Sequence, residues 1–326
     1  MLAQYGILEG RKYPSSAGWL RHYPERDYHR GLMLAAGKCE TEEVLEESLS
    51  YSKAKLLIPP STPAHFQGQV WGPRREFDFG RAAHRRILGE GAEFEVLPST
   101  GWLTAKGEEA ANPAATKEYK ARRAEIEAAG LTPVSEKDAA IIDAMEERLR
   151  DHSTALDLLT GDGDAEVSMW GQDPASQCWL RGRMDYWNRD QGLIVDYKTT
   201  KSAAPVYAGT AMWKYHYELQ AAWYLTVAGL AGIDVTGFVF IMQEKHAPYA
   251  VSVVRLDEAS VNVGRDEMRT VIDLWTRCRA SGVWPAYADE VVTVGLPRWA
   301  YTTDGVDTSE ADALAQLLEE DEGEDE

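Results

Sequence analysis

Hydrophobic and polar residues alternate with a period of two through the middle of the chain, which predicts a β-rich centre. Apolar residues at helical spacing on both sides of this centre predict flanking helices. The expected strands are 94–97, 166–170, 177–187, 193–199, 237–243 and 249–255. The expected helices are 42–49, 50–58, 62–66, 77–88, 113–130, 135–159, 215–228 and 257–280.

These elements predict an α/β fold in which a central mixed β-sheet is flanked by helices. The main domain is expected over 50–300, after an N-terminal extension over 1–49. Residues 301–326 form an acidic tail that is expected to be disordered. The chain shows no internal repeat.

One predicted hairpin presents charged groups at the point where a buried strand emerges. Leu193–Val195 is apolar, and Asp196 and Lys198 then lie on one face because side chains alternate along a strand. Asp185 lies on the preceding strand, and the turn-forming residues 188–192 join the two. The hairpin is therefore expected to bring Asp185 and Asp196 together.

Two neighbouring carboxylates repel each other unless a positive charge lies between them. A hard divalent cation with oxygen ligands removes this repulsion. A nearby lysine can steer or deprotonate a water molecule, or neutralise charge on a phosphate. The alternative is an ordinary Asp–Lys pair on a surface hairpin, since such triplets are common.

The net charge of −19 over 326 residues argues by itself against a nucleic-acid partner. Nine acidic residues after position 308 account for much of this charge, and the rest of the chain carries −10. Two arginine- and lysine-rich stretches, 74–86 and 117–123, form a locally basic surface. Such a surface is compatible with DNA binding without requiring it.

The cysteines and the apolar runs exclude several classes of protein. Cys39, Cys178 and Cys278 form no C-x-x-C pair, so an iron–sulfur site or a disulfide framework is not indicated, and buried thiols are expected. No apolar run reaches the roughly 18–20 residues of a membrane span. The first residues lack the features of a signal peptide. We expect a cytoplasmic protein with no membrane partner.

Four further residues accompany the hairpin in the sequence. His84 lies on an upstream predicted helix, and Glu166 begins the strand that precedes Asp185. Gln220 and Tyr224 are four residues apart and share one helix face. Taken singly, each is a weak indicator, because a lone histidine is more often a surface or core residue, and a Q-x-x-x-Y face usually serves packing.

In this order the motifs resemble the PD-(D/E)XK nuclease superfamily. Within it the chain is most similar to the exonuclease VIII type of phage and prophage recombination exonucleases, related to the lambda exonuclease and RecB nuclease domains. The resemblance covers about residues 50–280. The residues that carry it are G-x-A-x-H at Gly80–His84, R-G-R-x-D at Arg181–Asp185, I-V-D-Y-K-T-T at Ile194–Thr200 and Y-E-L-Q-A-A-W-Y at Tyr217–Tyr224.

The resemblance implies a role for each candidate residue. The metal ligands would be His84, Asp185, Asp196 and the main-chain carbonyl of Tyr197, and Lys198 would be the catalytic lysine. Glu166 would add an outer carboxylate, while Gln220 and Tyr224 would position the lysine or a DNA phosphate. Mg²⁺ is the expected cofactor, with Mn²⁺ able to replace it, because the ligands are mainly oxygen.

The resemblance further implies a 5′→3′ double-strand DNA exonuclease of phage or prophage origin, acting in the cytoplasm of a bacterial host. It would leave 3′ single strands for an annealing recombinase and would assemble into a homo-oligomeric ring. Two alternatives stay open. One is another nuclease of the same fold, either a structure-specific endonuclease or a single-strand exonuclease. The other is a non-catalytic DNA-binding or assembly protein, against which the intact Asp185, Asp196 and Lys198 argue.

Overall fold

The computed structural model describes residues 5–8, 11–14, 17–21, 28, 48–69 and 75–295. The chain divides into two compact units, Met1–Trp284 and Pro285–Glu326. Every helix and strand named below belongs to the first unit. In the second unit, the described stretch 285–295 contains neither helix nor strand. Cys39 and the expected acidic tail lie outside the described residues.

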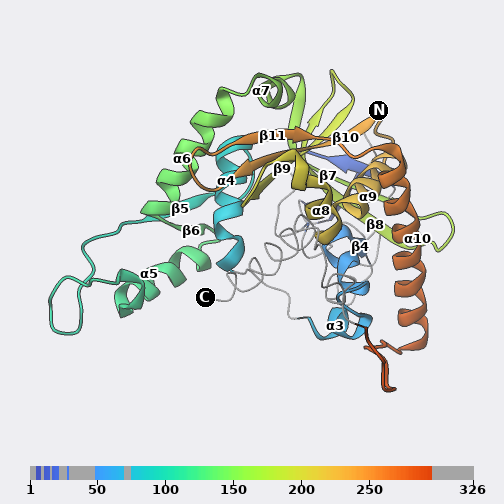
Figure 1. The fold of residues 1–326 in the computed structure, drawn as a ribbon, viewed down its shortest axis with the longest axis horizontal. Coiled ribbons are helices and arrows are strands. Elements are labelled where there is room, and N and C mark those ends of the chain that lie inside the picture. Colours follow the sequence, from blue (N-terminus) through green and yellow to red (C-terminus); the bar gives the residue numbers. More distant parts are fainter. Residues whose placement is uncertain are drawn as a thin grey trace, which may run out of the picture. The chain divides into compact units, whose positions relative to one another are not determined.

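A seven-stranded sheet forms the centre of the first unit (Figure 1). The pairs β9–β10 and β4–β8 are parallel and the other pairs are antiparallel, so the sheet is mixed, as predicted. The path runs β11-β10-β9-β8-β7-β3, and β4 pairs with β8 off this path. In path order the strands are Val251–Val254 (β11), Gly237–Glu244 (β10), Leu193–Thr200 (β9), Trp179–Asn188 (β8), Gly163–Gln172 (β7) and Gly18–Leu20 (β3), with Ser48–Ser50 as β4.

Helices cover both faces of this sheet and create two apolar cores. Ile194 and Phe240 belong to one core, and their neighbours Val195 and Ile241 belong to the other, as the period of two predicts. The first core is covered by α2 (Tyr51–Ala54), α8 (Pro205–Lys214), α9 (Tyr217–Leu230) and α10 (Glu258–Ser281). The second is covered by α4 (Asp78–Leu88), α6 (Glu136–Arg150) and α7 (Ser153–Thr160).

Smaller elements surround this arrangement. The strands β1 and β2 form an antiparallel pair, and β5 and β6 form a parallel pair. Short 3-10 helices cover 55–57, 75–77 and 113–115. The bounds are Tyr5–Leu8 (β1), Arg11–Pro14 (β2), Phe94–Leu97 (β5), Thr132–Ser135 (β6), Pro63–Gly68 (α3) and Lys117–Ala128 (α5).

Several features of the fold differ from the prediction, and the strands β1, β2, β3 and β6 were not predicted. The single helix expected over 135–159 is two helices: α6 ends at Arg150, and His152 then caps α7 by accepting the Ala155 N–H at its Nδ1 atom (3.2 Å). Helix α8 was not predicted. The helix expected over 42–49 is wrong at Ser48 and Leu49, which belong to strand β4, and its other residues lie outside the described part.

The N-terminal segments contribute to the sheet. Strand β3 pairs with β7, and β4 pairs with residues 179–181 of β8, so strands from the N-terminal side of residue 50 complete it. Cys178 and Cys278 are buried free thiols, as expected. Within the described ranges, no helix is both long and apolar enough to cross a membrane.

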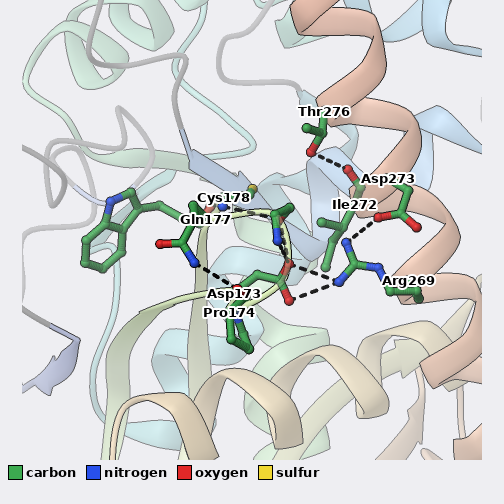
Figure 2. Close-up of polar contacts among 10 residues, drawn as sticks. Asp173, Pro174, Gln177, Cys178, Arg269, Ile272, Asp273 and Thr276 are labelled. Atoms are coloured by element: carbon green, nitrogen blue, oxygen red, sulfur yellow. Dashed lines mark hydrogen bonds and ion pairs between the residues drawn. The ribbon is translucent and has the colours of Figure 1, made fainter.

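An ionic clamp ties the turn between β7 and β8 to helix α10 (Figure 2). The buried carboxylate of Asp173 accepts hydrogen bonds from the Ser176 N–H (2.8 Å) and from Nη1 of Arg269 (3.0 Å). Arg269 also donates to Asp273 one helical turn away (2.6 Å). Burial opposes ionisation of Asp173, but the hydrogen bonds from Ser176 and Arg269 outweigh it and lower its pKa.

We expect Asp173→Ala to lower the free energy of unfolding by about 1–3 kcal/mol, because Ser176 and Arg269 lose a buried, charged acceptor. Urea denaturation of the full chain measures this change. Asp273→Ala is the matched control, since Asp273 is half exposed and such ion pairs contribute about 0–1 kcal/mol. Equal losses in the two variants would contradict the clamp.

Candidate active site

The hairpin strands β8 and β9 part where the two predicted aspartates lie. Their ladder runs from Asn188↔Leu193 to Tyr186↔Val195 and stops there. Asp185 and Asp196 would form the next pair. Oδ2 of Asp185 instead accepts the main-chain N–H of Tyr197 (2.9 Å). A side chain thus replaces a strand-to-strand hydrogen bond, and the hairpin brings both carboxylates to this opening, as predicted.

The opening is bounded by a second strand on the same edge of β8. Strand β7 pairs with β8 along its length, while β4 covers 179–181 and β9 covers 186–188. Residues 182–185 of β8 therefore lie between the ends of β4 and β9. This stretch contains Arg183 and Asp185, so the sequence motif R-G-R-x-D falls at the gap.

Glu166 lies opposite Asp185 in the β7–β8 register and has a left-handed backbone (φ 54°). Side chains two residues apart on a strand normally point to the same face, but here those on either side of Glu166 and of Asp185 point to opposite faces. Ala165 and Tyr186 pack in the core under α4 and α6, whereas Val167 and Met184 pack in the core under α9. The carboxylate of Glu166 pairs with Nε of Arg183 (2.5 Å).

Asp196 is held from two sides. Nζ of Lys198 lies 2.5 Å from its Oδ2 atom, and Nε2 of Gln220 donates to its Oδ1 atom (2.6 Å). Both contacts lie on the face covered by α9. Nζ of Lys198 also lies 5.3 Å from the ring centre of Tyr217, which stacks on Phe240. The ammonium therefore rests between a carboxylate and an aromatic face.

His84 reaches the opening from α4, on the other face of the sheet. Its Nδ1 atom lies 3.5 Å from Oδ2 of Asp185, and its ring packs edge-on against Tyr197. Burial and the charge of Lys198 lower the pKa of His84, which favours the neutral imidazole that binds metals. His84, Glu166 and Asp185 each offer a ligand atom within 4.8 Å of the other two.

The three carboxylates Glu166, Asp185 and Asp196 outnumber the two cationic side chains that pair with them, Arg183 and Lys198. Burial, with Glu166 nearby, raises the pKa of Asp185 to about 7. Burial and the charge of Asp185 raise the pKa of Asp196 to about 6. Burial alone would lower the pKa of Lys198, but Asp196 and Asp185 more than offset it, so the pKa rises and the lysine stays protonated. Buried carboxylates beside a neutral imidazole are a donor set that fits a divalent cation.

The remaining predicted residues occupy different positions. Gln220 contacts Asp196 directly, whereas the ring of Tyr224 packs edge-on against Phe238. Burial raises the pKa of Tyr224, and the charges of Asp196 and Asp185 add to this. The main chain of Tyr197 bonds to Asp185 and to His84, while its hydroxyl donates to Gln243 (2.7 Å). The proposed roles of these side chains stay predictions.

Two residues of the site were not singled out from the sequence. Arg183 neutralises Glu166, and Tyr217 lies beside Lys198. Both fall inside motifs that carried the resemblance, and Arg183 shares the parity of Asp185 along β8. The spacing of two residues between Arg183 and Asp185 on one strand was the signal that could have identified Arg183. The position of Tyr217 depends on how α9 packs.

Five arginines of the basic stretches predicted from the sequence form ion pairs within the fold. Asp78, which is buried, pairs with Arg81 (2.7 Å) and with Arg123. Arg86 pairs with both Asp143 and Glu146 (2.7 Å each). Arg85 pairs with Glu93, and Arg122 pairs with Glu95. These arginines dock α4 and α5 onto their neighbours.

Comparison with known proteins places this chain in a family. The model of the PDDEXK-like domain of unknown function DUF3799 matches residues 63–295. The chain belongs to this PDDEXK-like family. The match spans α3 to α10 and includes every candidate residue named above. It confirms the PD-(D/E)XK fold that the resemblance of the motifs predicted.

Solved structures resemble the chain at low identity. A candidate exonuclease from Eubacterium rectale is 13% identical, with a TM-score of 0.50 over 83% of this chain and 99% of that one. A phage-related exonuclease from Haemophilus somnus is 12% identical, with a TM-score of 0.28 over 72% of this chain and 95% of that one. The first supports the fold. None of the curated proteins compared with the chain matches it.

Stabilisation by Mg²⁺ should increase with pH. The raised pKa values of Asp185 and Asp196 mean that the folded chain binds more protons than the unfolded chain between about pH 4 and 7. Without metal, the free energy of unfolding contributed by these groups therefore falls as pH rises. Mg²⁺ binds the ionised carboxylates, so it should restore up to about 2.7 kcal/mol at 100 times its Kd.

Thermal unfolding at pH 5.5 and pH 8, with Mg²⁺ and with EDTA, measures this difference. We expect the rise in Tm caused by Mg²⁺ to be larger at pH 8. Asp185→Asn keeps the shape of the side chain but replaces the carboxyl with an amide that does not titrate. In this variant, Mg²⁺ should raise Tm only slightly at both pH values. If Mg²⁺ raises the Tm of the unmodified chain equally at both pH values, metal binding is not coupled to ionisation of these carboxyl groups.

Proposed function

We propose that this chain is a divalent-metal-dependent exodeoxyribonuclease that acts on duplex DNA ends. The observation that carries the proposal is the convergence of Asp185, Asp196 and Lys198 where β8 and β9 part, in a member of a PDDEXK-like family. His84 from one face and Gln220 from the other complete the arrangement. Mg²⁺ is the proposed cation, with Mn²⁺ able to replace it.

In this proposal Asp185, Glu166 and His84 hold the cation, because their ligand atoms already lie within 4.8 Å of one another. Asp196 and the Tyr197 carbonyl are further proposed ligands. The bound cation would polarise the scissile phosphate and lower the pKa of a water molecule. Gln220 fixes one oxygen of Asp196, which leaves the other to Lys198 or the cation.

Lys198 is proposed to stabilise charge rather than to act as a base. Its pKa is raised by Asp196 and Asp185, so its ammonium stays protonated at neutral pH. A protonated lysine can neutralise the negative charge that develops on the phosphate during hydrolysis. The ring of Tyr217 beside the ammonium restricts the directions from which Lys198 can reach the phosphate.

The direction of digestion and the partners are proposed from the exonuclease VIII-like motifs. We propose 5′→3′ digestion that leaves 3′ single strands for an annealing recombinase, by a homo-oligomeric ring. The names of the Eubacterium rectale and Haemophilus somnus proteins as exonucleases agree with this activity class. One chain supplies all the proposed site residues, from both faces of its sheet. In this proposal, hydrolysis itself therefore does not require the ring.

Linear duplex DNA with phosphorothioate linkages at the 5′ ends, at the 3′ ends or at neither tests this function. We expect Mg²⁺-dependent digestion of the unblocked and 3′-blocked duplexes, and protection by 5′ blocks and by EDTA. Digestion only of 3′ ends, of single strands or of closed circles would favour the other nucleases of this fold. Absence of hydrolysis on all substrates would favour a non-catalytic binding protein.

Lys198→Met should reduce the digestion rate at least 100-fold, because it removes the charge that faces the phosphate while leaving the carboxylates in place. Isothermal titration of Mn²⁺ should show that this variant still binds metal. Lys201→Met is the matched control, since Lys201 is exposed just beyond β9 and should digest DNA at the unmodified rate. Near-normal activity of Lys198→Met would overturn the assignment.

A further inference from the structure

A second group of metal-binding side chains lies where α9 and α10 meet. It consists of His216 at the start of α9, Glu218 in its first turn and Glu267 on α10. Nδ1 of His216 lies 3.6 Å from Oε1 of Glu218 and 3.8 Å from Oε2 of Glu267. The ligand atoms of the three lie within 4.8 Å of one another, and the group shares no residue with the candidate active site.

The three ligand atoms are buried and have no hydrogen-bond partner. Each of Nδ1 of His216, Oε1 of Glu218 and Oε2 of Glu267 is inaccessible to solvent, and Glu218 as a whole is only 3% exposed. A buried carboxylate oxygen without a partner is costly, because it has lost its water without gaining a donor. The oxygen of Glu218 lies within 4.8 Å of a ring nitrogen of His216 and a carboxylate oxygen of Glu267, both of which can bind a metal.

The other ring nitrogen of His216 indicates which atom carries the proton. Nε2 lies 3.0 Å from the main-chain carbonyl of Pro59, which can only accept. Nε2 is therefore the donor, and Nδ1 of a neutral imidazole presents its lone pair to the two glutamates. A histidine that donates one N–H to a carbonyl and turns its other nitrogen to carboxylates is the usual arrangement of a metal ligand.

The spacing also fits a shared cation better than a hydrogen bond. Separations of 3.6 and 3.8 Å are too long for an N–H···O bond. Two ligands at about 2.1 Å from a tetrahedral Zn²⁺ lie about 3.4 Å apart, close to these values. We propose that His216, Glu218 and Glu267 bind a divalent transition-metal ion of the Zn²⁺ type, with water as the fourth ligand.

The position of this site gives the ion a structural role. Helix α10 approaches the start of α9 so closely that a Cβ atom at Gly264 would lie 2.0 Å from the carbonyl oxygen of Glu218. The ion would join the two helices and the segment at Pro59 at one point. Gln220, two residues after Glu218, holds Asp196, so the ion would fix the helix turn that positions the nuclease carboxylate.

The competing arrangement is a protonated His216 between the two glutamates. Glu218 and Glu267 raise the pKa of His216 to about 9 when no ion is present, so a protonated His216 offsets one of the two carboxylate charges, whereas a divalent ion offsets both. They differ in metal content and in the protonation of Nδ1. An experiment that measures bound metal therefore separates them.

The experiment uses full-length chain carrying His84→Ala and Asp185→Ala, which removes two ligands of the nuclease site and makes the result independent of the proposed function. After chelator treatment, isothermal titration with ZnCl₂ should show one Zn²⁺ per chain. Adding Glu267→Gln should weaken this binding at least tenfold. Adding Asp266→Asn, an exposed acid in the same turn, should leave the affinity unchanged.

X-ray absorption at the zinc edge identifies the ligands of the bound ion without a substitution at His216, Glu218 or Glu267. We expect one imidazole and two carboxylates around the ion in the nuclease-site variant. Absence of Zn²⁺ binding below about 100 μM, equal affinities in the two added variants, or a shell without imidazole would each overturn the proposal. In those cases a protonated His216 shared by Glu218 and Glu267 replaces the ion and offsets one of their two charges.

Discussion

The hydrogen bond between Asp185 and the main chain of Tyr197 is the constraint on which the site depends. It satisfies the N–H that β9 would otherwise present to β8, and so allows the two strands to part without leaving a buried donor unpaired. The charged groups of the hairpin can then occupy a gap inside a sheet. Without this substitution the ladder would continue, and two carboxylates would face each other across closed strands.

The hairpin could be predicted because its signals are local. The apolar start at Ile194 and Val195, the turn at 189–192 and the period of two fix which side chains share a face, and the two cores receive them accordingly. Asp196 and Lys198 therefore lie together whatever surrounds them. Most of the helices that flank the sheet were predicted from equally local signals, since α4, α6 and α10 carry apolar stripes and α9 is apolar around most of its surface.

Features that depend on distant segments could not be predicted in this way. Helix α8 contains Gly209 and several exposed apolar residues, so its pattern is weak, and β4 is a strand only because β8 offers it an edge. The break between α6 and α7 rests on one histidine cap. The contacts of Arg183, Tyr217 and Glu267 depend on packing between elements far apart in sequence.

The origin of the site residues on both faces of the sheet has a consequence for folding. His84 is anchored in the layer of α4 and α6, and Gln220 in the layer of α9 and α10, while the carboxylates lie between them. Neither layer alone can assemble a competent site. Under the proposed function, a nascent or damaged chain with one half in place would therefore not hydrolyse DNA, and activity would depend on both layers being folded.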